Sequence, residues 1–254
     1  MKKRTIVLPL VFLLGSVLIC LLTVGLFLLA GGSLAQTPTQ PDEQQSVPEA
    51  PSGKPRVVII DAGHGGEDGG AVGVTGLVEK ELNLDLAKRL CALLEADGAQ
   101  VIMTRTEDVL LYDRGADFQG RKKALDLAAR QAIGDANPEA VFVSLHANTF
   151  PQEIYHGLQV WYSPNHPKSA LLAEEIRGEV VATLQPDNHR QCKQAGSNIF
   201  LLYKLQIPAV LVECGFLSNP AECSALEDAA YRDQLAHALY AGIVAYYECD
   251  TDTQ

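Results

Sequence analysis

The sequence predicts a single α/β domain in which a mostly parallel, twisted sheet carries helices on both faces, preceded by an N-terminal transmembrane or signal segment. Short β-branched runs alternate along the chain with longer segments of helical periodicity. Such alternation is typical of a parallel sheet that is covered on both sides. The expected domain, residues 56–248, is long enough to bury a core without disulfide bonds.

The N-terminal 30 residues are expected to direct the chain to the membrane. "KKR" at residues 2–4 precedes an uncharged apolar segment, residues 5–30. At about 1.5 Å per residue, this segment can cross a hydrocarbon core of about 30 Å as a helix. It exceeds the signal-peptide core of about 7–15 residues, which favours an uncleaved anchor, although "SLAQ" at residues 33–36 leaves a cleaved signal open. In both cases the basic flank predicts that the domain is extracytoplasmic, membrane-anchored or secreted.

A linker and a short tail flank the expected domain. Residues 31–55 are rich in Pro, Gln, Ser and Gly, a composition typical of a flexible tether, and residues 249–254 form the tail. Four of the 20 basic and three of the 31 acidic residues lie in residues 1–55, which leaves 16 against 28 and a formal charge of −12. An acidic surface repels phosphate backbones, so nucleic acid is not expected as a partner.

The first half of the domain contains three expected strands and two expected helices. Val57 to Ile60 form a β-branched run that predicts a buried strand. Leu82, Leu86, Leu90 and Leu93 share one face of a helix that stops at Gly98. The elements that follow are a strand at residues 100–105, a helix at 121–133 and a strand at 140–148.

The second half continues the alternation. An apolar face at Leu172, Ile176, Val180 and Leu184 indicates a helix packed on a sheet. The expected order is a strand at 157–163, this helix at 166–184, a polar loop at 185–199, the apolar run "IFLLY" at 199–203, a strand at 209–216 and a closing helix at 232–247.

Three of the apolar strands lead to chemically active side chains. "VVIID" leads to His64, "VFVSL" to His146 and "AVLV" to Glu213. In open α/β sheets, ligands bind outside the carboxyl ends of the strands. The topology therefore predicts that two imidazoles and one carboxylate gather at one edge of the sheet.

The glycine-rich loop around His64 does not fit a phosphate-binding loop. After Gly63 and Gly65, a dinucleotide fingerprint requires glycine at the position of Asp68, and no GK[ST] motif occurs. Glu67 and Asp68 would also repel a pyrophosphate. A single glycine-flanked histidine is commonly a turn residue, but two histidines at two strand ends favour a metal site.

Zinc is the metal that this set of side chains favours, because Zn²⁺ takes histidine nitrogens and carboxylates and keeps a position for water in catalytic sites. A third ligand is required, and both Glu79 and Glu81 at the start of the first helix are candidates, each also suited to a plain helix N-terminus. Glu213 is a stronger candidate than either, because a carboxylate in an apolar strand would be costly to bury unless it is paired or used. The five cysteines outside the expected anchor form no CxxC pair, so a thiolate zinc site is not expected, and one disulfide bridge is left open.

Five motifs resemble those of the zinc-dependent N-acetylmuramoyl-L-alanine amidases of the amidase type 3 family, in the family's order. They are "IIDAGHGGEDGGAVG", "GLVEKELNL", "VIMTRTED", "VSLHAN" and "PAVLVECGFLSNPAE". The resemblance implies Zn²⁺ bound by His64, Glu79 and His146, with Glu213 as the catalytic carboxylate. It thereby selects Glu79 over Glu81. One departure is Ala62, where the family often has proline.

The resemblance also implies a substrate and a reaction. The substrate would be peptidoglycan, cleaved at the amide between N-acetylmuramic acid and L-alanine. The short chain, the expected anchor and "SNIFLLYKLQIPAVLVECGFLSNPAE" look most like the germination-specific amidases that act on spore cortex, where stem-peptide removal precedes muramic-δ-lactam formation. A vegetative autolysin and a non-catalytic peptidoglycan-binding domain are the alternatives. Whether an activating protein partner is needed is left open.

Overall fold

The computed structural model describes residues 56–113, 115 and 120–251. The expected anchor and linker, residues 1–55, lie outside this part of the chain. None of the helices within it is long and apolar enough to span a membrane. The strands are β1 (Val57–Ala62), β2 (Gln100–Met103), β3 (Val141–Asn148), β4 (Gln159–Tyr162), β5 (Lys193–Gln194) and β6 (Ala209–Phe216).

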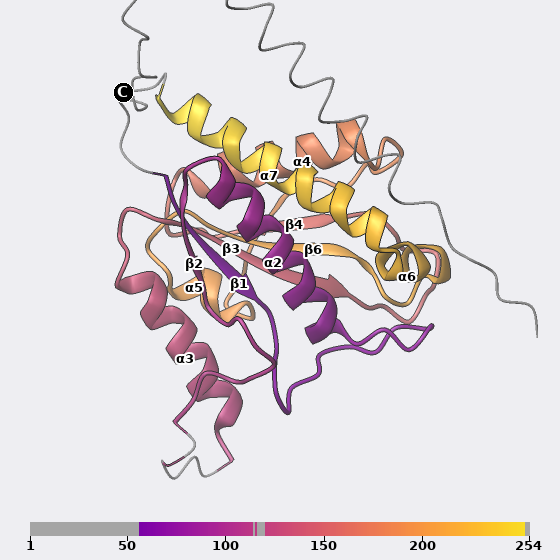
Figure 1. Ribbon diagram of the computed structural model, residues 1–254, viewed down its shortest axis with the longest axis horizontal. Helices are drawn as coiled ribbons and strands as arrows, with labels where there is room; N and C mark the ends of the chain where they lie inside the picture. Colours follow the sequence, from indigo (N-terminus) through magenta and orange to yellow (C-terminus); the bar gives the residue numbers. More distant parts are fainter. Residues whose placement is uncertain (1–55, 114, 116–119, 252–254) are drawn as a thin grey trace, which may run out of the picture. The chain divides into compact units, whose positions relative to one another are not determined.

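Helices separate most of these strands along the chain (Figure 1). Each expected helix is present, within a few residues of its predicted bounds, except that the closing helix continues to Thr251, beyond the expected domain end at residue 248. The helices are α2 (Glu79–Ala96), α3 (Lys122–Asp135), α4 (Ser169–Thr183), α5 (Phe200–Lys204), α6 (Pro220–Glu227) and α7 (Ala229–Thr251).

In the described residues, one six-stranded sheet has the order β2-β1-β3-β6-β4-β5. All neighbouring strands are parallel except β4 and β6, which are antiparallel. The expectation of a mostly parallel sheet is therefore met, with one antiparallel pairing that makes the sheet mixed. The carboxyl ends of β1, β3 and β6 lie side by side, because these three strands are parallel neighbours.

The two faces of the sheet belong to two hydrophobic cores. Val58 and Ile60 of β1 pack with α2, α4 and α7 on one face, and Val57 and Ile59 pack with α3 and α5 on the other. This alternation follows from the strand period of two residues. Both faces of β1 are covered, so the strand is buried along its whole length, including Asp61. The central strands are thus rigid supports for the side chains at their ends.

The predicted helical faces need one adjustment. In α2, Leu82, Leu86 and Leu90 are fully buried, but Leu94 is the next buried residue and Leu93 is half-buried. The buried leucines of this helix are therefore four residues apart throughout, whereas a spacing of three was expected after Leu90. In α4, Leu172, Ile176 and Val180 are fully buried as expected.

Three elements were not anticipated. Helix α5 falls on the apolar run "IFLLY", to which no element type was assigned. Strand β5 is only two residues long and lies in the expected polar loop, so it carries no hydrophobic pattern. Helix α6 follows Asn219, whose side chain accepts hydrogen bonds from the backbone nitrogens of Ala221 and Glu222, and Pro220 is its first residue. Asparagine as N-cap followed by proline is a helix-start signal, so "SNPAE" contained the information for α6.

Candidate metal centre

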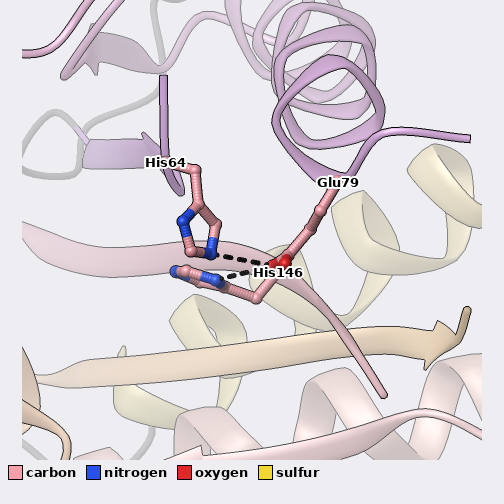
Figure 2. A group of neighbouring side chains, drawn as sticks. All are labelled: His64, Glu79 and His146. Carbon is pink, nitrogen blue, oxygen red and sulfur yellow. Dashed lines mark hydrogen bonds and ion pairs between the residues drawn. The ribbon is translucent and has the colours of Figure 1, made fainter. Parts of the chain in front are cut away.

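His64, Glu79 and His146 converge at the carboxyl edge of the sheet, although they come from three different elements (Figure 2). His64 lies in the loop after β1, Glu79 is the first residue of α2, and His146 lies near the end of β3. Nε2 of His64 is 3.2 Å from Oε1 of Glu79, and Nδ1 of His146 is 3.0 Å from the same oxygen. The two imidazole rings are arranged edge to face, 4.9 Å apart. Both histidines therefore present a nitrogen to one carboxylate oxygen.

Glycines let the backbone come this close to the site. A Cβ atom at Gly63 would lie 2.3 Å from the ring of His146, and one at Gly70 would lie 2.5 Å from Oε2 of Glu79. No side chain can stand at those distances without displacing its neighbour. The glycines around His64 therefore serve close packing against the two other members of the cluster.

Glu79 is fixed by the backbone as well as by the histidines. Its side chain is 5% exposed. The backbone nitrogen of Ala71 donates to Oε2 at 2.8 Å, and that of Ala147 donates to Oε1 at 3.1 Å. The competing candidate, Glu81, is exposed on the same helix and outside the cluster. A buried carboxylate with donors on both oxygens has little freedom to rotate.

The electrostatic state of the cluster favours an ionised carboxylate. Burial raises the pKa of Glu79, but hydrogen bonds from His146 and His64 outweigh burial and hold this pKa well below its usual range. For His64, burial lowers the pKa, and the hydrogen bond and charge of Glu79, followed by those of Asp68, raise it above its usual value. The cluster thus stabilises positive charge next to Glu79, as a cation-binding site must.

Glu213 stands opposite His146 on the neighbouring strand. The two residues are register partners in the parallel pairing of β3 with β6. Oε2 of Glu213 is buried without a hydrogen-bond partner. Burial raises the pKa of Glu213 to about 7, a shift that the charge of His146 opposes and that of Glu79 increases. A carboxyl group with a pKa near neutrality is suited to accept and donate protons at physiological pH.

The donor set fits a small divalent cation. Ligand atoms placed tetrahedrally at about 2.1 Å from a zinc ion lie about 3.4 Å from one another. The separations of 3.0 and 3.2 Å between the Glu79 oxygen and the two histidine nitrogens are close to this value. Two imidazoles and one carboxylate form a common catalytic zinc set. Among the described residues, no other group of three or more His, Cys, Asp or Glu side chains is arranged in this way.

Comparison with known proteins places the domain in a family. The family model for N-acetylmuramoyl-L-alanine amidase matches residues 58–245. The chain belongs to this amidase family. A germination-specific N-acetylmuramoyl-L-alanine amidase of Bacillus subtilis is 35% identical over 192 residues, which cover 76% of the chain and 80% of that relative. LytC, another N-acetylmuramoyl-L-alanine amidase of this bacterium, is 34% identical over 192 residues, which cover 75% of the chain and 35% of LytC.

Solved structures agree with the family assignment. The CwlD amidase from Clostridioides difficile, whose structure is in complex with the GerS lipoprotein, is 36% identical and superposes with a TM-score of 0.72. The superposition covers 76% of this chain and 99% of CwlD. The resemblance seen in the five motifs is therefore confirmed, and the protein is a peptidoglycan amidase.

Asp68 is a member of the site that the sequence did not reveal as such. In the amidase, its Oδ2 lies 3.0 Å from Nδ1 of His64, at ion-pair distance. Burial raises the pKa of Asp68, and the hydrogen-bonding and charge interactions with His64 outweigh it and lower that pKa. Carboxylates commonly orient a metal-binding histidine through its second ring nitrogen. The signal available in the sequence is the acidic residue four positions after His64.

The remaining histidines and cysteines of the amidase lie outside the cluster. His156, His189 and His237 are exposed and His166 is half-buried. The cysteines of the described residues form no disulfide bridge with one another. These cysteines are Cys91, Cys192, Cys214, Cys223 and Cys249.

Proposed function

We propose that the amidase holds Zn²⁺ with His64, Glu79 and His146, and that Glu213 is its catalytic acid and base. The observation that supports this most strongly is the convergence of three ligand atoms within 4.8 Å of one another. Glu213, whose Oε2 has no partner, lies on the adjacent strand opposite one of these ligands. The reaction is hydrolysis of the amide between the lactyl group of N-acetylmuramic acid and L-alanine.

Zn²⁺, when bound, acts as a Lewis acid toward the scissile carbonyl and makes a water molecule more acidic. Glu213 accepts the proton of the attacking water as the new C–O bond forms. It then delivers this proton to the amine nitrogen of L-alanine as the C–N bond breaks. The raised pKa of Glu213 suits both directions of transfer, and positioned acid/base groups contribute about 10²–10⁴ in rate.

The biological setting that we propose is the spore cortex, where removal of stem peptides precedes muramic-δ-lactam formation. The germination-specific relative is matched over 80% of its length, whereas LytC is matched over only 35% of its length. A vegetative autolysin is the alternative. A non-catalytic binding domain is disfavoured, because all four candidate residues are present and three of them converge.

For localisation and partners, we propose that residues 1–30 anchor or export the chain, so that the domain reaches peptidoglycan outside the cytoplasm. The basic flank and the apolar segment support this orientation. The CwlD neighbour was solved in complex with a lipoprotein. A membrane-attached protein partner is thus a candidate activator of this amidase as well.

The proposed reaction is tested by digestion of purified peptidoglycan with the full chain in detergent. Mass spectrometry should detect intact stem peptides with a free L-alanine amino group and glycan strands that keep their lactyl carboxylate. Cleavage inside the stem peptide or in the glycan would contradict the proposal. A comparison of spore-cortex with vegetative peptidoglycan separates the two biological settings, and activity without added proteins would show that no activator is required.

A further inference from the structure

The backbone that carries His64 is held by two buried arginines. The carbonyls of Ala62, Gly63 and His64 all accept hydrogen bonds from guanidinium groups. Arg105 donates from Nε to Ala62 at 2.8 Å and from Nη2 to Gly63 at 3.0 Å. Arg130 donates from Nη1 to Ala62 and from Nη2 to His64, both at 2.8 Å. Arg130 is thus the arginine that donates a hydrogen bond to the carbonyl of His64 itself.

Arg130 is locked in place by two carboxylates. Its Nη1 lies 2.5 Å from Oδ1 of Asp61, and its Nε lies 2.8 Å from Oδ2 of Asp126. Arg130 is 1% exposed and Asp61 is fully buried. Burial raises the pKa of Asp61, but the charge of Arg130 and hydrogen bonds from Ser144 and Thr104 outweigh it, so the carboxylate stays ionised. Since every guanidinium nitrogen of Arg130 has a hydrogen-bond partner, the planar group is held in one orientation.

His64 needs such support because its backbone is strained. With φ at 62°, it is the one non-glycine residue with positive φ among those described. A side chain with a Cβ atom is disfavoured in this left-handed region, and residues remain there only where the surroundings hold them. The Arg130 hydrogen bond to the His64 carbonyl fixes the peptide that follows the strained residue. The same backbone supports the second histidine, because the ring of His146 packs against Gly63.

We propose that Arg130 is a positioning residue of the metal centre: its fixed guanidinium holds the left-handed backbone of His64 and thereby aims the imidazole at the metal. This inference rests on the proposed zinc site. The competing view is that Arg130 only neutralises Asp61. The two views differ for Arg130→Lys, since lysine keeps the charge but lacks the planar fork that reaches Asp61, Asp126 and two carbonyls at once.

The test uses the full chain in detergent and measures Zn²⁺ affinity by chelator competition, together with the visible absorption of the Co²⁺-substituted protein. Loss of outer-shell partners typically lowers metal affinity about 10–100-fold. Arg130→Lys should therefore lose about this much Zn²⁺ affinity and show an altered Co²⁺ spectrum. These readouts report on ligand geometry and do not depend on activity.

Arg232→Lys is a matched control. Arg232 also pairs with a carboxylate, Asp85 at 2.6 Å, and also donates to two carbonyls, those of Leu226 and Glu227 at 2.8 Å. It lies on α7 and contacts no member of the cluster. We expect Arg232→Lys to keep the wild-type Zn²⁺ affinity and Co²⁺ spectrum, which would show that the loss in Arg130→Lys is specific to the site.

A folded Arg130→Lys protein with wild-type affinity and spectrum would overturn the inference. If Arg130→Lys does not fold, Asp126→Asn is measured instead, since it loosens the guanidinium while keeping a hydrogen-bonding side chain. It should show a smaller loss of affinity in the same direction, and no change would overturn the inference. A wild-type protein that binds no zinc would instead contradict the proposed metal site itself.

Discussion

His146 and Glu213 face each other as register partners on the parallel strands β3 and β6, one inside the three-residue cluster and the other beside it. The pairing explains how two side chains 67 positions apart in the chain share one site, because a parallel ladder fixes their separation. Glu213 is not among the three side chains whose ligand atoms converge. In the proposed mechanism, the cluster provides the metal ligands and Glu213 on the neighbouring strand carries the proton.

Removal of either histidine should abolish zinc binding. Two remaining ligands give a much weaker site, so His64→Ala and His146→Ala should both lose the metal. Elemental analysis of the purified proteins checks this. His237→Ala is the matched control, because His237 is exposed and bonded only to the carbonyl of Asp233. Full zinc content in either cluster variant would show that the ligand assignment is wrong.

The side chains at the carboxyl edge of the sheet could be predicted from sequence, because each strand that leads to them is marked by a local pattern of residues. Apolar runs that lead to His64, His146 and Glu213 indicate the strands and also the reactive side chains that follow them. For Glu79 the local pattern was not sufficient. Spacing alone could not decide between Glu79 and Glu81 as the ligand, and only the family resemblance selected Glu79. The structure adds a physical reason, since the first residue of α2 is buried against the cluster and the third faces solvent.

The supporting network could not be predicted. Arg130 and Asp61 are 69 positions apart, and nothing near either residue in the sequence indicates the partner. The antiparallel direction of β4 could not be predicted either. Strand direction is decided by pairing with distant strands and not by local periodicity. Asp68 was noted only as a charge that would repel phosphate, although its position four residues after His64 places it beside the imidazole.

Gly63→Ala should damage the metal centre without a change in any ligand. The new methyl group would lie 2.3 Å from the His146 ring, so the ring or the loop must move, and Zn²⁺ affinity should fall. Gly178→Ala in α4 is the control, because a Cβ atom there meets nothing within 4 Å. Alanine in a helix interior should stabilise it by about 0.5–1 kcal/mol relative to glycine. Chelator competition and thermal unfolding measure both effects, and unchanged affinity in Gly63→Ala would refute the packing argument.

The metal-free protein should lose stability as the pH rises through the titration range of Glu213. Burial raises the folded-state pKa from 4.5 to about 7, so the folded state binds this proton more tightly than the unfolded state. The contribution of this proton to the free energy of unfolding is present below about pH 4.5 and is lost between about pH 4.5 and 7. Its upper limit is roughly 3 kcal/mol. Glu213→Gln lacks this dependence.

Denaturant unfolding in the presence of a chelator measures the pH effect. The stability of Glu213→Gln relative to wild type should increase between pH 4.5 and pH 8. Glu81→Gln, at an exposed position on α2, serves as control and should follow the wild type. A difference between Glu213→Gln and wild type that stays constant with pH would mean that Glu213 is not held in a desolvated position.

The orientation of the chain can be tested on intact cells. The "KKR" flank should keep the N-terminus in the cytoplasm and place the domain outside. Protease added to intact protoplasts should then degrade the domain while a cytoplasmic marker protein survives. A domain that is protected until the membrane is lysed would rule out the exported orientation.

The most direct test of the proposed mechanism is the zinc content and turnover of Glu213→Gln, measured on the same preparation. Glutamine keeps the shape of the side chain but cannot carry the proton. We expect bound zinc equal to wild type and a release of free L-alanine amino groups from peptidoglycan that is slower by about 10²–10⁴, the usual contribution of a positioned acid/base group. Loss of zinc would make Glu213 a ligand, and retained zinc with near-normal turnover would place the catalytic base elsewhere and contradict the mechanism.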